Sequence, residues 1–241
     1  MSIEAHRIIV GGLHVDVVRK PIKNLHMGVY PPNGRVRVAA PVTVSDEAVR
    51  LAVVTRMAWI KRQRAKFEAQ ARQSERAYVS GESHFFLGRR YRLNVISQDG
   101  APRISLRNGR LIDFRIRADS QTIERERAFQ NWMRRELRKA AAPLIEKWAQ
   151  RTGLPVPLWG IRRMKTKWGT CNAKAGRIWL NLELIKKPSH CLEYVIVHEM
   201  AHFRERHHND QFIAMMNELL PRWGSIREEL NAVPLGHENW T

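Results

Sequence analysis

The sequence predicts an α+β fold, because blocks of strand-like residues alternate with long helical patterns along the chain. Turn-bounded runs of β-branched residues occur before residue 40 and again between residues 83 and 117. Helical periodicity follows each block, and a further helical region lies toward the C-terminal end. The 44% hydrophobic content of the 241 residues is sufficient for a core of domain size.

The N-terminal block combines short strands with one long helix. Strands are expected where β-branched residues cluster between turn signals such as Gly11-Gly12, at residues 8–10, 15–18 and 35–38. Ser45 is expected to cap a helix over about 45–76, because acidic residues follow it in the first turn and apolar residues recur at helical spacing.

The second block is expected to form β hairpins over residues 83–117. Asn108-Gly109, between two apolar segments, is typical of a two-residue type I′ turn. A second long helix is expected from about 120 to 152, where Gly153 ends it. No internal repeat is apparent in the residue pattern.

The remaining chain is expected to hold two short strands, around 157–163 and 176–182, followed by helices. The second strand alternates apolar and polar residues, so it is either an edge strand that could pair with an extended peptide or an ordinary core strand. Ser189 is expected to cap the next helix. We therefore expect a strand-rich N-terminal part, residues 1–118, and a C-terminal part, residues 119–241.

The most informative string is His198-Glu199-Met200-Ala201-His202. Apolar residues at helical spacing place it on a buried helix. Two histidines at i and i+4 lie on one helix face, so both imidazoles can bind the same metal ion. Histidines on a buried, apolar helix need a polar partner, and metal ligation at this spacing would provide one.

A catalytic zinc site uses three protein ligands and leaves one position for water. The third ligand is expected shortly downstream, where an Asn-Asp pair can begin a new helix and turn the chain back. His208 is the preferred candidate and His207 the alternative, whereas Glu218 and Glu193 are weaker candidates.

Glu199 is expected to be the general base toward zinc-bound water rather than a metal ligand. Tyr194 lies one helical turn before His198. It therefore either packs in the core or faces the metal as a hydrogen-bond donor.

The net charge of +19 indicates a polyanionic partner such as nucleic acid, a nucleotide or an acidic membrane surface, although solvated helix faces would give the same composition. The two cysteines form no C-x-x-C pair, which favours a reducing compartment. Neither a signal-peptide pattern nor a long apolar segment is present, so we expect a cytoplasmic protein without a membrane span.

From about residue 158 onward the sequence resembles the YgjP-like metallopeptidase family, relatives of SprT-like and other small zincins. The strings that carry the resemblance are MKTKWGTC at 164–171, LNL at 180–182, YVIVHEMAH at 194–202, and His208 with Phe212 four residues later. The N-terminal part resembles the strand-rich segment of that family. The resemblance thus covers about 10–225, which would make one continuous domain.

The resemblance implies a zincin-like (SprT/gluzincin-type) α+β catalytic core with Glu199 as base. The zinc ligands that it implies are His198, His202 and His208. Lys167, Thr170 and Ile213 depart from the residues usual in the family, and none of the three belongs to the metal chemistry.

Basic residues flank Trp168 before the second of the C-terminal strands. They predict either an anion site for an oxyanion or phosphate, or a buried tryptophan with solvated lysines around it. The candidates for this role, or for support of the metal ligands, are Tyr194, Lys165, Lys167, Trp168 and Asn181.

These observations predict a zinc-dependent hydrolase, most simply a metallopeptidase acting on protein or peptide. One alternative is a metal-dependent nucleotide phosphohydrolase, and another is a nucleic-acid-binding protein with a structural zinc. A closed structural site would need a fourth ligand and would leave Glu199 unexplained. Three imidazoles also suit manganese, cobalt or iron.

Overall fold

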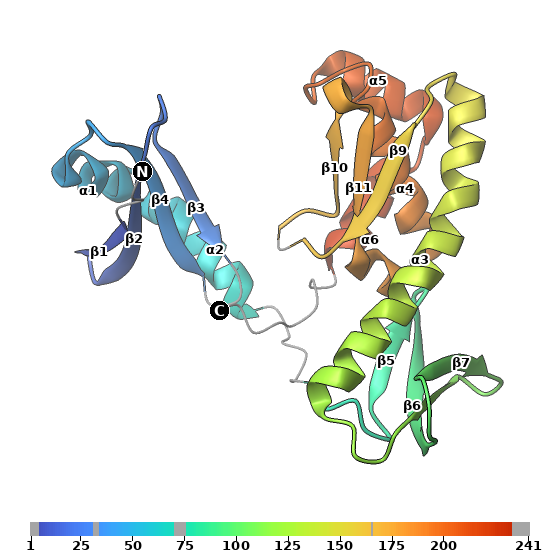
Figure 1. Cartoon of the computed structure of the whole chain (residues 1–241). Coiled ribbons are helices and arrows are strands. Elements are labelled where there is room, and N and C mark those ends of the chain that lie inside the picture. Colours follow the sequence, from blue (N-terminus) through green and yellow to red (C-terminus); the bar gives the residue numbers. More distant parts are fainter. Residues whose placement is uncertain (1–4, 31–33, 70–75, 165, 233–241) are drawn as a thin grey trace. The chain divides into compact units, whose positions relative to one another are not determined.

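The structure is a computed structural model that describes residues 5–30, 34–69, 76–164 and 166–232, without the side chains of 66–69 (Figure 1). The chain divides after Ser74 into two compact units, which are described separately. This division differs from the expected boundary near residue 118, because the strands between 83 and 116 pack on the helix that follows them.

The first unit is a four-stranded sheet covered on one face by two helices. Its sheet order is β1-β2-β4-β3, with the central pair parallel and the outer pairs antiparallel. Valines of β2 and β4 pack against Val49, Val53 and Ile60 of the helices. The elements are β1 (Ala5–Val10), β2 (Leu13–Lys20), β3 (His26–Tyr30), β4 (Arg35–Pro41), α1 (Asp46–Thr55) and α2 (Met57–Ala69).

The single helix expected over 45–76 is wrong, because α1 ends at Thr55 and α2 begins after Arg56. The Thr55 hydroxyl donates to the carbonyls of Leu51 and Ala52, a contact that bends helices. Thr55 also follows two valines, and such β-branched runs lower helix propensity. The Ser45 cap is confirmed, since its hydroxyl accepts from the Ala48 N–H at 3.2 Å.

The second unit begins with another four-stranded sheet, followed by the long helix α3 (Thr122–Thr152). Its order, β5-β6-β8-β7, has the same pattern of antiparallel, parallel and antiparallel pairs as the first unit. The first hairpin of each sheet is closed by two residues with positive φ, Gly11-Gly12 and Leu87-Gly88. The strands are β5 (Ser83–Phe86), β6 (Arg89–Ser97), β7 (Arg103–Arg107) and β8 (Leu111–Ile116).

The chain therefore contains the same four-stranded topology twice, contrary to the expectation of no internal repeat. The repeat is hidden in the sequence because the first core is mostly aliphatic, with many valines, whereas the second combines leucine and isoleucine with aromatic residues. The turn between β7 and β8 also differs from the prediction. It spans three residues, and its positive-φ pair is Gly109-Arg110 rather than Asn108-Gly109.

α3 runs along the whole second unit in Figure 1 and joins its two halves. Phe129 and Trp132 near its beginning pack on the β5–β8 sheet, where Trp132 stacks on Phe86 with ring centroids 5.1 Å apart. Trp148 near its end belongs to the same core cluster and donates to Glu193 at 2.9 Å. The predicted stop is confirmed, because Gly153 adopts φ 67°.

A three-stranded sheet and three helices complete the second unit. The sheet order β10-β11-β9 makes β11 the central strand, so the strand expected around 176–182 is not at an edge. Ser189 is the first helical residue and Pro188 the N-cap, one residue earlier than expected. The elements are β9 (Leu158–Arg162), β10 (Gly169–Asn172), η1 (Ala173–Ala175), β11 (Arg177–Asn181), η2 (Leu182–Lys186), α4 (Ser189–Ala201), α5 (Asp210–Leu219) and α6 (Trp223–Ala232).

The β5–β6 hairpin is tied to the start of α4. The Leu87 N–H donates to the Ile185 carbonyl at 2.7 Å. A Cβ added at Gly88 would lie 2.8 Å from Cγ and 3.0 Å from the backbone of Pro188. Gly88 is thus required both for its φ of 78° and for this close approach.

The repeat supplies a matched control for this contact. Gly12 occupies the same hairpin position in the first unit with φ 76°, and a Cβ there would meet nothing within 4 Å. Gly12→Ala should cost about 1 kcal/mol from backbone strain, and Gly88→Ala about 2–5 kcal/mol because steric overlap adds to the strain. Urea unfolding of both variants would measure this, and equal losses would contradict the packing argument.

Candidate metal centre

The string from His198 to His202 lies at the end of a helix that is buried on almost every side. Residues of α4 from Cys191 to Val197 are buried apart from Glu193, and so are the three residues from Glu199 to Ala201. His198 lies in the last turn and His202 caps the C-terminal end. The chain then turns, and Asn209 caps α5 by accepting from the Phe212 N–H at 3.0 Å. This cap confirms the predicted turn and brings His208 back toward α4.

Three imidazoles meet at this turn. One ring nitrogen of each of His198, His202 and His208 lies within 4.8 Å of the others. The Nε2 atoms of His198 and His208 are 3.1 Å apart. Phe212 packs on all three rings, with centroid separations of 4.7 to 5.1 Å. The geometry therefore selects His208 over His207 as the partner of the two helical histidines.

These residues fit a zinc ion. Two nitrogens bound at tetrahedral zinc lie about 3.3 Å apart, which is close to the separation of the His198 and His208 Nε2 atoms. Nδ1 of His202 lies 3.0 Å from the Glu205 carbonyl, so an N–H there would donate and leave Nε2 free to bind a metal. Nδ1 of His198 is a buried polar atom without a hydrogen-bond partner in the described structure.

Electrostatics favour the neutral imidazole at His198 and His208, which is the form that metal binding requires. Burial, together with the neighbouring His202 and His208, lowers the pKa of His198 to about 3. Burial and His202 also lower the pKa of His208. These two rings thus present lone pairs rather than positive charges to the space between the histidines.

Glu199 lies on α4 beside His198, with its carboxylate against β10. Burial raises the pKa of Glu199 to about 7, although Lys167 and a hydrogen bond from the Cys171 backbone N–H act in the opposite direction. A Cβ added at Gly169 would lie 2.6 Å from Glu199 Oε1 and 2.7 Å from its Cγ. The absence of a side chain at Gly169 is therefore what lets the carboxylate lie against the strand.

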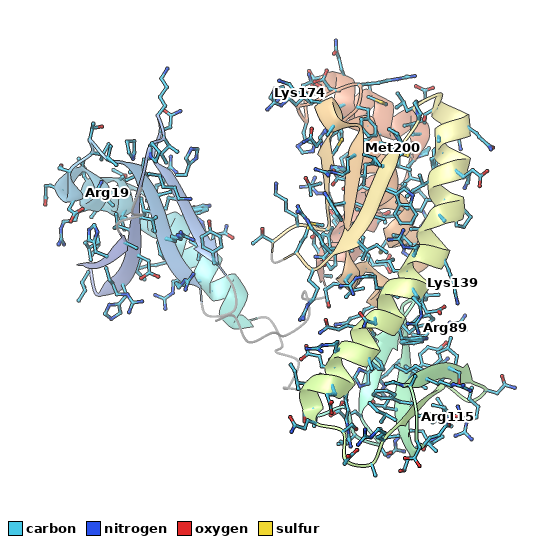
Figure 2. All side chains as sticks on the ribbon, in the orientation of Figure 1. Arg19, Arg89, Arg115, Lys139, Lys174 and Met200 are labelled. Atoms are coloured by element: carbon cyan, nitrogen blue, oxygen red, sulfur yellow. The ribbon has the colours of Figure 1, made fainter. Side chains whose placement is uncertain are left out.

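The histidines and Glu199 open into a cleft of about 890 Å³. Its walls come from β10, the turn after α4, and α6. Among the described residues, four lysines and arginines line the cleft, and Glu199 contributes the one carboxylate. The basic residues are Lys167, Lys174, Arg206 and Arg227; Figure 2 labels Lys174, which follows β10.

The remaining candidates occupy different places. Tyr194 and Trp168 line the cleft, and Trp168 donates to Asn231 of α6 at 3.2 Å. Asn181 is fully buried and does not line the cleft. Its amide donates to the carbonyls of Met164 and Lys167 at 2.8 Å each, so it holds the loop that carries Trp168. Lys165 lies outside the described residues.

The weaker ligand candidates lie elsewhere. Glu193 accepts hydrogen bonds from Lys147 at 2.8 Å and from Trp148, and it faces α3. Glu218 is exposed on α5, and neither carboxylate belongs to the histidine group within the described structure. His207 is exposed and its N–H donates to Glu205 at 3.2 Å.

Sequence reasoning missed several contributors to the site. The role of Gly169 depends on how closely β10 approaches α4, which no local pattern reveals. Arg206 and Arg227 reach the cleft only because the turn and α6 pack beside α4. Phe212 occurs in the strings that carry the family resemblance, and its spacing of four from His208 was the available signal.

Comparison with known proteins identifies the family of the chain. The family model described as a YgjP-like metallopeptidase domain matches residues 25–233. The chain belongs to the YgjP-like family. Membership in a metallopeptidase family implies a hydrolase that uses a metal, usually zinc. No curated protein matches the chain.

Among solved structures, the chain is similar to the metallopeptidase zymogen abylysin of Pyrococcus abyssi. The identity is 22%, the TM-score is 0.36, and the match covers 38% of this chain and 92% of the other. In the described part of the chain, no helix has both the length and the apolar character needed to cross a membrane.

The adjacent histidines allow a direct test of the ligand set. His208→Ala should weaken zinc binding by more than about a hundredfold, because it removes one of three ligands. Loss of a residue that only supports a ligand typically costs about 10- to 100-fold, and loss of a ligand should cost more. His207→Ala should leave zinc binding unchanged. Competition with a chelating dye would measure both affinities, and equal losses would contradict the assignment of His208.

Proposed function

We propose that this protein is a zinc-dependent metallopeptidase with a zincin-like catalytic core. The observation that carries the proposal is the convergence of His198, His202 and His208 beside Glu199 in one open cleft. The three histidines would hold the zinc, which when bound activates water for attack and polarises the scissile carbonyl.

Glu199 would be the general base that takes the proton of the attacking water and returns it to the leaving amine. Its position supports this role, since it neighbours the ligand His198 and is oriented by the Cys171 N–H. Tyr194 lines the same cleft and could donate to the developing oxyanion.

The sheet supports binding of an extended peptide. β10 is one of the two edge strands of the β9–β11 sheet, and its residues Gly169 to Asn172 line the cleft. An extended substrate could pair with such an edge and pass the metal ligands. β10 would thus have the peptide-pairing role for which the strand around 176–182, now β11, was one candidate from the sequence.

A second candidate function is favoured by the charge of the cleft. Its described lining holds four basic residues and one carboxylate, so its field attracts anions. This lining suits a nucleotide phosphohydrolase, in which Lys167 and Arg227 would bind phosphate oxygens. For the peptidase, the same lining predicts a preference for peptides with acidic side chains near the scissile bond.

One substrate panel tests both candidates. Zinc-loaded protein and Glu199→Ala would be compared on labelled unfolded casein, on acidic and neutral peptides, and on nucleoside triphosphates. Loss of the base should lower peptide cleavage roughly 10²- to 10⁴-fold while zinc stays bound. Glu218→Ala, at an exposed glutamate of α5, is the matched control and should keep full activity.

Release of phosphate or pyrophosphate that depends on Glu199, without peptide cleavage, would replace the peptidase by the phosphohydrolase. Activity that persists in Glu199→Ala would contradict the assignment of the base in either case.

Gly169→Ala tests how the base is positioned. The added methyl group would overlap the Glu199 carboxylate and displace it, so turnover should fall roughly a hundredfold with zinc content unchanged. Gly224→Ala is the control, because a Cβ there meets nothing within 4 Å. Full activity of Gly169→Ala would show that the carboxylate does not need this contact.

A further inference from the structure

The β5–β8 sheet has one covered face and one open face. Phe86, Ile112 and Phe114 pack into the core on the side of α3. Because side chains alternate along a strand, their neighbours in sequence lie on the opposite face. The strand register places the open-face residues in four rows: Phe85 with Arg90; Ser83 with Arg92, Leu111 and Arg107; Asn94 with Asp113 and Ser105; Ile96 with Arg115 and Arg103.

Arginine dominates this open face. Five of its side chains are arginines, and one is a carboxylate, so it carries an excess of four positive charges. Four of the arginines are exposed and Arg115, labelled in Figure 2, is half-buried. No lysine occurs between residues 83 and 117, although the chain as a whole has many. Arginine differs from lysine in binding phosphate through two parallel hydrogen bonds and in stacking on planar rings.

The single carboxylate organises the surface rather than neutralising it. Asp113 is only 5% exposed and accepts from Asn94 at 2.8 Å. It also holds Arg107 at 3.4 Å and Arg115 at 3.8 Å. The guanidinium groups are thus fixed in direction by a buried anion. Among the described residues, Arg90, Arg92 and Arg103 form no ion pair, so their charge is available to a ligand.

Apolar surface lies between the guanidinium groups. Phe85 is 39% exposed and stands opposite Arg90, while Ile96 and Leu111 are half-buried in the neighbouring rows. An exposed aromatic ring beside arginine is a stacking surface for bases, and every base presents a planar face to it. Four strands give a platform roughly 15 Å wide, which accommodates a few nucleotides.

The first unit presents a related arrangement, in which the aspartate lies on β2 rather than on the strand equivalent to β8. On the open face of its sheet, Asp16 accepts from Arg7 at 2.8 Å and holds Arg35 at 3.5 Å. A central aspartate between two arginines therefore occurs on the open face of both copies of the repeat. The cores of the two copies differ in residue type, whereas this surface feature is common to both.

We propose that the open face of the β5–β8 sheet binds single-stranded nucleic acid, with arginines on the phosphates and Phe85 stacked on a base. The combination of a flat basic sheet, an exposed ring and exposed apolar side chains favours a single strand, because the bases of a duplex are already stacked and unavailable. This proposal does not rest on the metallopeptidase assignment.

The test uses the full-length, zinc-loaded protein and a fluorescent oligothymidylate or oligouridylate of about 16 nucleotides. Arg90, Arg92 and Arg103 are changed together to glutamine, which spares the arginines that hold Asp113. The dissociation constant from fluorescence anisotropy should rise at least about tenfold, and the slope of log affinity against log salt should fall by about 2, since each lost phosphate contact contributes about 0.7.

The matched control changes Arg127, Arg135 and Lys139 of α3 to glutamine. These side chains are exposed in the same unit and remove the same charge. The control should lose less than about threefold in affinity, because charges outside the contact surface act only through the screened field. Circular dichroism and zinc content of both triple variants establish that the unit is folded.

Phe85→Leu separates stacking from charge. It should weaken binding at least about fivefold while leaving the salt slope unchanged, because a base contact is lost without a phosphate contact. Duplex DNA of the same length should bind more weakly than the single strand. Glu199→Ala should bind the oligonucleotide like the wild type, so failure of the peptidase proposal leaves this result interpretable.

Three outcomes would overturn the proposal. Equal losses in the sheet variant and the α3 control would mean that net charge alone attracts the oligonucleotide. An unaffected Phe85→Leu together with tighter duplex binding would exclude a single strand as the ligand. Capture by phosphatidylserine vesicles that depends on Arg90, Arg92 and Arg103, without oligonucleotide binding, would assign the face to a membrane surface.

Discussion

The burial of α4 is the constraint on which the second unit depends. This helix is enclosed by α3, the β9–β11 sheet, α5 and α6, yet it carries an imidazole and a carboxylate that need polar partners. These partners are found at the cleft, where one side of α4 is open. There His198 lies beside two further imidazoles, and Glu199 accepts a hydrogen bond from the backbone of β10. Burial lowers the pKa of His198, so its imidazole stays neutral and can bind a metal. Burial raises the pKa of Glu199, so its carboxylate accepts a proton more readily.

α3 gives the second unit its continuity. At one end its aromatic residues form the core of the β5–β8 sheet, and at the other end Lys147 and Trp148 hydrogen-bond to Glu193 of α4. The core is one cluster from sheet to metal helix. The proposed nucleic-acid face and the proposed catalytic cleft therefore belong to the same compact unit. A nucleic-acid strand bound to the sheet would keep the cleft close to any protein attached to that strand.

The structure groups many of the basic residues of the second unit at two places. Along the sequence the basic residues are spread over helices and strands alike, whereas the structure gathers some of them in the cleft and some on an open sheet face. On the sheet face, the buried carboxylate of Asp113 forms ion pairs with Arg107 and Arg115 and so limits the directions in which their guanidinium groups point. Directed guanidinium groups lose less entropy on binding an anion than free side chains do.

The sequence by itself determined what depends on neighbours along the chain: the helix with its two histidines, the Ser45 cap, the helix start at the Asn-Asp pair, and the glycine stop of α3. Its spacing signals also indicated the third histidine, although the choice between His207 and His208 needed the path of the turn. Only the tertiary structure decided the repeated sheet topology, the contact of Gly169 with Glu199 and the arginine face. Each of these joins elements far apart in sequence, and packing rather than local pattern sets their distance.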